Sequence, residues 1–223
     1  DNIRNYLPAE SYKKDGFETI ATNPCAEIPL SAYDSCRLIS INLKNFVKNK
    51  FAKKAMFDFE HFTQVVKAGM RLSDDLVELE KIIAAADSPD EKELWNKILS
   101  ACSKGRRTGL GTHGLADALA CLNLAYDSEA ALKIIDNIYG TLKETAYRES
   151  CLLAEERGAF EVFDWNTEKD NLFIKSLSPE LQKLIAKCGR RNISILTNAP
   201  TGSVSIMSQT SSGLEPVFRN SYI

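Results

Sequence analysis

The stretch Asn192-Ile193-Ser194-Ile195-Leu196, followed closely by Asn198-Ala199-Pro200-Thr201-Gly202-Ser203, decides the fold. Its first part is a short apolar run bounded by polar residues, which is typical of a buried strand with Ile193 and Ile195 on one face. Its second part is rich in glycine and hydroxyl groups and indicates a turn. In α/β proteins, ligands bind where strands end in such loops. We therefore predict an α/β fold in which a site follows this strand.

The rest of the sequence is mainly helical, because apolar residues recur every three or four positions over long stretches. Four helix starts carry a capping residue, and two of them add proline at the first helical position. These starts are Asp58, Ser88-Pro89, Asp127-Ser128 and Ser178-Pro179. The matching helix ends are predicted near Asp87 and at Gly105, Gly158 and Gly189. We expect the helix that begins after Ser88 to bury Leu94 and Trp95.

Other segments are shorter. Residues 39–47 alternate weakly between apolar and polar and are predicted to form a strand, and residues 17–22 lead into another short strand. The run 109–114, Gly-Leu-Gly-Thr-His-Gly, lacks the spacing of a dinucleotide-binding fingerprint, so we interpret it as a tight packing turn before a short helix over 115–122. Arginines near helix ends are expected to complement the helix dipoles. These are Arg106, Arg107, Arg190 and Arg191.

The composition is that of a globular protein with a substantial core. The 223 residues are 44% hydrophobic and 26% charged, and 28 basic against 30 acidic residues give a net charge of −2. This balance gives no reason to expect a nucleic acid polymer as partner. We find no signal peptide and no stretch near the roughly 18 apolar residues of a membrane helix. The first residue is Asp1, so we expect either a processed protein or a piece of a longer chain.

The six cysteines divide into two groups. Cys102, Cys121, Cys151 and Cys188 lie on predicted helices and are interpreted as packing residues. Cys25 and Cys36 lie in the turn-rich N-terminal part. No CxxC motif occurs and the two histidines are far apart, so we predict no metal site. Unpaired buried thiols indicate a reducing compartment, the cytoplasm.

Two stretches carry residues suited to chemistry. In an extended segment Asn23, Cys25 and Glu27 would share one face, which places a thiol between an amide and a carboxylate that can act as a base. The alternative is a surface loop with a buried cysteine. Cys36 is either a redox partner of Cys25 or an unrelated packing residue. The loop over 198–205 has the glycine and hydroxyl content of an anion-binding turn, or it is an ordinary polar loop.

Taken together and in this order, these stretches resemble the catalytic subunit of ribonucleotide reductases. The resemblance runs from about Thr22 to Phe218, and the form of the 23–30 and 200–203 motifs is similar to class II, the adenosylcobalamin-dependent branch. The matching motifs are the finger loop at 23–30, the segment after it at 36–43, the helical regions at 106–117 and 154–160, and the phosphate-binding stretch at 200–205 and 211–218.

The resemblance implies a fold and an organisation. The fold would be about half of a ten-stranded α/β barrel, rich in helix, with the finger loop on its N-terminal side. We expect a single segment over residues 1–223, with the finger loop at about 22–37, a helical region at about 58–189, and a strand plus phosphate-binding loop at about 192–213.

The resemblance also implies an activity, the reduction of ribonucleotides (diphosphates or triphosphates) to deoxyribonucleotides by thiyl-radical chemistry with adenosylcobalamin as cofactor. Cys25 would carry the radical, Glu27 would act as general base and Asn23 would orient the ribose hydroxyls. Cys36 would be one half of the reducing dithiol. The residues expected to bind the substrate phosphates are Pro200, Thr201, Gly202, Ser203, Val204 and Ser205.

Parts of the family pattern are missing. The second redox cysteine and the effector region precede the finger loop in the family, and further segments follow the phosphate loop. We therefore expect the chain to be inactive alone and to need the rest of the reductase and a thioredoxin-like reductant. Two alternatives stay open: a class I catalytic subunit, whose tyrosine pair is not seen beside Tyr222, and an inert assembly piece. Ala26 stands where relatives often have glycine.

Overall fold

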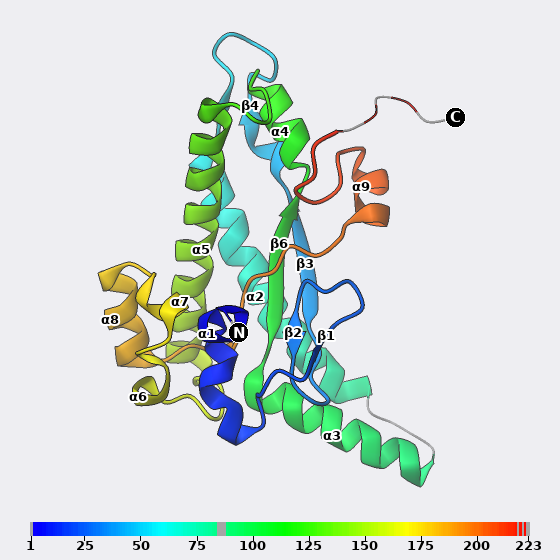
Figure 1. Cartoon of the computed structure of the whole chain (residues 1–223), viewed down its shortest axis with the longest axis vertical. Coiled ribbons are helices and arrows are strands. Elements are labelled where there is room, and N and C mark those ends of the chain that lie inside the picture. The colour runs from blue at the N-terminus through cyan, green and yellow to red at the C-terminus, as the bar shows by residue number, and fades with distance from the viewer. Residues whose placement is uncertain (1, 84–87, 218, 220, 222–223) are drawn as a thin grey trace.

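A parallel pair of strands forms the centre of the molecule, shown in Figure 1 as a computed structural model. Strand β3 (Arg37–Asn42) pairs with β6 (Thr108–His113), in a register that runs from Arg37 opposite Thr108 to Asn42 opposite His113. The structure describes residues 2–83, 88–217, 219 and 221. The predicted helix end near Asp87 and the residues Phe218 and Tyr222 lie outside these ranges.

The existence of β6 corrects the interpretation of the glycine run as a turn. All six residues of β6 are buried, and its two glycines make room for neighbouring segments. A Cβ atom on Gly109 would lie 2.6 Å from the Cys36 sulfur, and one on Gly111 would lie 2.0 Å from the Thr197 carbonyl oxygen. Real Cβ atoms do not approach other atoms so closely, so glycine is required here for close packing.

The predicted strand over residues 192–196 follows the other edge of β6. The N–H groups of Thr108 and Leu110 donate to the carbonyls of Ser194 and Ile195, both at 3.0 Å, and Thr197 N–H donates to the Leu110 carbonyl at 3.2 Å. The pairing amounts to one parallel bridge, between Leu110 and Leu196, so the segment is less regular than predicted. Ile193 and Ile195 are fully buried, as predicted.

Helices pack against this centre, and two long ones lie along one side of it (Figure 1). The predicted caps at Ser88, Ser128 and Ser178 are confirmed, since each side chain accepts a hydrogen bond from the first helical turn. Leu94 and Trp95 are exposed, which corrects their predicted burial. The larger helices are α2 (Phe59–Ile83), α3 (Pro89–Gly105), α4 (Leu115–Cys121), α5 (Glu129–Arg157), α8 (Pro179–Cys188) and α9 (Gly202–Ser208).

The remaining elements are short. Asn42 ends β3 because its side chain caps a 3-10 helix, by accepting from Lys44 N–H at 3.1 Å, so the predicted strand over 39–47 is interrupted. The short elements are α1 (Asn2–Tyr6), the 3-10 helices η1 (Pro8–Asp15) and η2 (Leu43–Phe46), β1 (Ala21–Thr22), β2 (Pro29–Leu30), β4 (Val47–Lys48), β5 (Met56–Phe57), α6 (Trp165–Glu168) and α7 (Leu172–Lys175). No helix within the described ranges is long and apolar enough to cross a membrane.

The arginines near helix ends also form ion pairs with buried carboxylates, while their predicted interaction with the helix dipoles stays a prediction. The fully buried carboxylate of Asp74 on α2 contacts Arg106 at 2.8 Å, Arg157 at 3.2 Å and Arg191 at 3.3 Å. Arg190 is likewise buried and pairs with Glu168 at 2.5 Å. Breaking a buried ion pair leaves an uncompensated charge, so these contacts strongly hold α2, the start of β6 and residues 190–192 in one arrangement.

Candidate functional site

The segment predicted to carry the reacting residues is a hairpin loop between β1 and β2. Asn23 closes the loop in three ways: its N–H donates to the Ile28 carbonyl, its carbonyl accepts from Ala26 N–H, and its side-chain Oδ1 accepts from Ile28 N–H, each at 3.0 Å. Ala26 has a left-handed backbone with φ 63°. The loop is therefore turned rather than extended, which corrects the extended conformation assumed for Asn23, Cys25 and Glu27.

The turn nevertheless brings two of these three residues to one cavity of about 390 Å³. Cys25, which is exposed, and Glu27 line it from the hairpin, and Asn198 and Pro200 line it from the loop that follows the segment along β6. The Glu27 Oε2 atom is buried and has no hydrogen-bond partner among the described residues. An unpaired buried carboxylate oxygen is costly, and a hydroxyl donated by a ligand would satisfy it.

Strand β6 holds both sides of this cavity in place. Thr197, which packs over Gly111, donates its hydroxyl to the Glu27 carbonyl at 3.0 Å. The side-chain Oδ1 of Asn198 accepts from the Thr112 N–H at 3.0 Å. The hairpin and the loop at 198–200 are thus both anchored next to the same strand, so their side chains meet although they are far apart in sequence.

Cys36 lies in a different environment from Cys25. It is half-buried above Gly109, and within the described ranges it is not one of the residues that line the Cys25 cavity. Burial raises the pKa of the Cys36 thiol to about 12, although the positive charges of Arg107 and Arg37 act in the opposite direction. Burial is the largest cause, and the negative charges of Asp34 and Glu27 raise the pKa of Cys36 further. Both guanidinium groups also pair with carboxylates, Arg107 with Asp34 at 2.7 Å and Arg37 with Glu80. Cys36 is therefore a protonated thiol at neutral pH.

The predicted phosphate-binding residues separate into two groups at the start of α9. Gly202, Ser203 and Val204 are exposed in the first helical turn, where backbone N–H groups have no partners within the helix. Thr201 and Ser205 are buried, and their hydroxyls are used within the protein. Thr201 Oγ1 accepts from Gly213 N–H at 2.7 Å, and the Ser205 hydroxyl donates to the Gly202 carbonyl at 2.8 Å.

These residues border two adjoining cavities. Pro200 lines the Cys25 cavity, whereas Gly202 and Ser205 line a second cavity of about 670 Å³. Glu215 lines both cavities, so they meet along the loop that follows α9. The arrangement offers exposed N–H groups next to a cavity that holds a thiol and a carboxylate.

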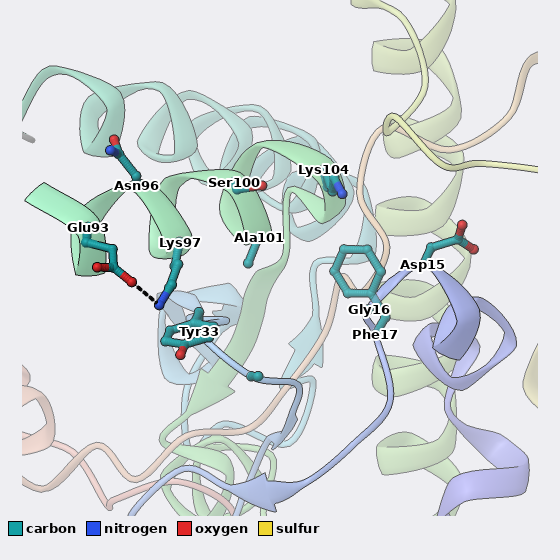
Figure 2. Close-up of a pocket in the computed structure, with 11 residues that line it drawn as sticks. Asp15, Gly16, Phe17, Tyr33, Glu93, Asn96, Lys97, Ser100, Ala101 and Lys104 are labelled. Atoms are coloured by element: carbon teal, nitrogen blue, oxygen red, sulfur yellow. Dashed lines mark hydrogen bonds and ion pairs between the residues drawn. The ribbon is translucent and has the colours of Figure 1, made fainter.

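A further cavity of about 480 Å³ lies between α3 and the start of the loop after β2 (Figure 2). The Lys97 ammonium pairs with Glu93 at 2.6 Å and lies 5.5 Å from the centre of the Tyr33 ring. Lys104 and Asp15 add one charge of each sign, so the lining has no clear preference for an anion or a cation. This cavity contains none of the predicted site residues.

No group of three or more potential metal ligands occurs in the part of the chain that the structure describes. All six cysteines are free thiols. Two residues of the site were missed by sequence reasoning, Thr197 and His113. His113 is buried at the end of β6 and hydrogen-bonds Ser40 and Ser208 through its two ring nitrogens, at 2.8 and 3.1 Å. The available signal was a polar ring inside the glycine run 109–114, but its closeness to α9 is a tertiary contact that the sequence does not show.

Comparison with known proteins agrees with the family resemblance and with the fold. The family described as "Ribonucleotide reductase, barrel domain" matches residues 10–223. The vitamin B12-dependent ribonucleoside-diphosphate reductase of Mycobacterium tuberculosis (strain CDC 1551 / Oshkosh) is 34% identical over 198 residues, which is 89% of this chain and 24% of that protein. The enzyme of the same name from Thermoplasma acidophilum is 33% identical over 203 residues, 91% of this chain and 22% of that protein.

A solved structure shows the same architecture. The Actinobacillus ureae class Id ribonucleotide reductase alpha subunit superposes with a TM-score of 0.66 at 25% identity, over 98% of this chain and 36% of that one. The fold is thus that of part of a barrel domain, and the chain belongs to the ribonucleotide reductase barrel-domain family. It spans about a quarter of the length of the curated relatives it matches.

Proposed function

We propose that this chain is part of a ribonucleoside-diphosphate or -triphosphate reductase, which replaces the ribose 2′-hydroxyl group by hydrogen. One observation carries the proposal: Cys25 and Glu27, whose Oε2 atom lacks a partner among the described residues, line one cavity next to the exposed first turn of α9. A ribose in this cavity would have its phosphates near that turn. Family membership supports the same reaction.

Cys25 is proposed to act first. The C3′–H bond of ribose is not acidic, so proton transfer cannot begin the reaction. A thiyl radical on Cys25 removes this hydrogen atom, which forms an S–H bond and leaves a radical on C3′. Glu27 accepts the proton of the 3′-hydroxyl as a general base. The 2′-oxygen then leaves as water, and the hydrogen returns to C3′ from Cys25 at the end of the cycle.

Because the hydrogen taken by Cys25 is returned, both electrons for the reduction come from a dithiol. Two thiols give up two hydrogens and become a disulfide, while the ribonucleotide becomes a deoxyribonucleotide and water. Cys36 is proposed as one of these thiols, and its protonated state supports this role because the thiol must deliver hydrogen as well as an electron. The second thiol would come from the rest of the reductase, and a thioredoxin-like protein would reduce the disulfide again.

Asn23 and the 200–205 loop are proposed to position the substrate. The side-chain Oδ1 of Asn23 accepts from Ile28 N–H, which leaves the side-chain NH₂ group to donate to a ribose hydroxyl. The N–H groups of Gly202, Ser203 and Val204 would bind the phosphates. The other members of the predicted set, Pro200, Thr201 and Ser205, would shape the loop through the contacts described above.

Adenosylcobalamin is the proposed cofactor. The residues fit this assignment because the thiol that must receive the radical is exposed rather than sealed in the core. When bound, adenosylcobalamin supplies the homolytic chemistry that protein side chains lack. Cys25 is the residue of this chain proposed to meet it. Two relatives that are named vitamin B12-dependent support the choice, whereas the likeness to a class Id alpha subunit favours a separate radical-generating subunit as the alternative.

The chain is proposed to work only within a larger reductase, in the cytoplasm, where its six free thiols would stay reduced. The test is to assay deoxyribonucleotide formation by the complete enzyme with a dithiol reductant, with and without adenosylcobalamin. We expect activity that depends on the cofactor, and no repeated turnover by the isolated chain. Activity of the complete enzyme without cobalamin would favour the class I alternative. No reduction of ribonucleotides under either condition would contradict the proposed function.

A further inference from the structure

His113 connects the centre of the sheet to the helix that carries the proposed phosphate-binding turn. It is the last residue of β6 and is 3% exposed. Its Nδ1 atom lies 2.8 Å from the Ser40 hydroxyl on β3, and its Nε2 atom lies 3.1 Å from the Ser208 hydroxyl at the end of α9. In Figure 1, α9 lies to one side of the upper end of β6.

The bonds on both sides are compatible with a neutral ring. A neutral imidazole has one donor and one acceptor nitrogen, and a serine hydroxyl can take either role, so either tautomer completes both bonds. Burial lowers the pKa of His113, which favours this neutral form. Ser208 in turn lies 2.9 Å from the Thr210 hydroxyl and 3.3 Å from the Ser205 carbonyl, so the ring is joined to the body of α9.

The loop after α9 extends this connection back to the first turn of the helix. Gly114, the residue after His113, donates its N–H to the Ser211 carbonyl at 3.1 Å. Two residues further on, Gly213 N–H donates to Thr201 Oγ1 at 2.7 Å, directly before the exposed residues Gly202 to Val204. Both ends of α9 are thus tied to the end of β6.

We propose that His113 is a positioning residue that sets the place of α9, and hence of its exposed first turn, for binding the substrate phosphates. This inference rests on the proposed function, in which that turn binds phosphate. His113 does not touch the substrate in this account. It acts through Ser208, so its removal would weaken substrate binding and leave the reaction of the bound substrate largely intact.

The test uses the full-length reductase with a ribonucleoside diphosphate as substrate. We expect His113→Leu and Ser208→Ala each to raise KM about fivefold, the effect of one lost hydrogen bond, with kcat within about twofold of wild type. A purely structural role would lower the amount of active enzyme, and hence the apparent kcat, without moving KM. His61→Gln is the matched control, because His61 is the other histidine of the chain and is exposed on α2.

Two conservative variants separate the two hydrogen bonds. The glutamine amide in His113→Gln reaches the position of Nε2 and can bond Ser208, whereas the asparagine amide in His113→Asn reaches only the position of Nδ1 and Ser40. We expect His113→Gln to keep KM within about twofold of wild type and His113→Asn to raise it about fivefold. If His113→Leu does not fold, these two variants and Ser208→Ala still test the positioning role of His113.

The outcomes are distinct. Unchanged KM in Ser208→Ala, or His113→Asn equal to or better than His113→Gln, would overturn the role of His113 while an active wild-type enzyme upholds the proposed function. A wild-type enzyme that does not reduce the ribonucleoside diphosphate or bind it would overturn the proposed function, and the inference with it.

Discussion

The β1–β2 hairpin and strand β6 belong to one candidate site, but the hairpin is largely exposed and the strand is buried. The hairpin presents an exposed thiol on a loop with a left-handed alanine, and few residues cover it. Strand β6 is buried along its whole length and carries two glycines where neighbours approach too closely for a side chain. The groups proposed to react therefore lie on an accessible loop, whereas a buried strand determines where that loop and the loop at 198–205 meet.

Among variants that keep the Cys25 thiol, the largest expected effect comes from removing the carboxylate of the hairpin. Glu27→Gln in the complete reductase should lower kcat by about 10²–10⁴-fold, because a general base is lost, while substrate binding and stability stay close to wild type. Steady-state kinetics and thermal unfolding measure the two properties. Glu18→Gln, an exposed glutamate in the same N-terminal part, is the control and should have wild-type activity. Equal turnover in both variants would remove Glu27 from the mechanism.

The second prediction contrasts the two N-terminal cysteines. The pKa of Cys36 is raised from 9.0 to about 12 by burial, so its thiolate fraction at pH 8 is lower by about 10³ than that of an ordinary cysteine. Iodoacetamide should therefore label the exposed Cys25 long before Cys36, and the rate at Cys36 should keep rising as pH increases toward 12. Peptide mass spectrometry over time gives both rates. Faster labelling of Cys36 would contradict its burial.

The third prediction tests the strand. Gly111→Ala places a methyl group against the Thr197 carbonyl, at a point where the backbone cannot yield easily. We expect the free energy of unfolding to fall by about 3 kcal/mol, as for other overpacked sites. Gly140→Ala is the control: it lies inside α5 with nothing within 4 Å of the new atom and should stabilise by about 0.5–1 kcal/mol. Urea unfolding measures the free energy of unfolding of both variants. An unchanged value for Gly111→Ala would contradict the close packing described at this position.

The smallest expected effect comes from a substitution that relieves backbone strain in the hairpin. Ala26 has φ 63°, a conformation that costs an L-residue about 1–2 kcal/mol and glycine almost nothing. Ala26→Gly should therefore stabilise the protein by about 0.5–1 kcal/mol after the entropy of glycine is counted. Ala32→Gly, at an exposed position without this strain, should destabilise slightly. If Ala26→Gly destabilised as much as Ala32→Gly, the described turn would be wrong.

Local signals made much of the fold predictable. The helix starts after Ser88, Ser128 and Ser178 were found because a cap and its helix are neighbours in sequence. Strand β6 was missed because its glycines resemble a turn, and the reason for Gly109 and Gly111 lies in Cys36 and Thr197, which are distant in sequence. The predicted burial of Leu94 and Trp95 was wrong, because a periodic apolar face does not show whether another element covers it.

The candidate site was predictable to a similar extent. Cys25 and Glu27 were identified from their spacing and from a family resemblance, and the structure brings them to one cavity. Their meeting with Asn198 and Pro200 depends on the anchor from Thr197 to the Glu27 carbonyl, which no local pattern reveals. The link from His113 to Ser208 is likewise a tertiary contact between segments far apart in the chain.

The role of the exposed thiol is tested most directly by one substitution. Deoxyribonucleotide formation should be measured for the complete reductase with Cys25→Ala, in the presence of adenosylcobalamin and a dithiol, alongside binding of the ribonucleotide. We predict that the variant binds the ribonucleotide and forms no deoxyribonucleotide above background. Deoxyribonucleotide formation at a rate close to that of the wild-type enzyme would contradict it.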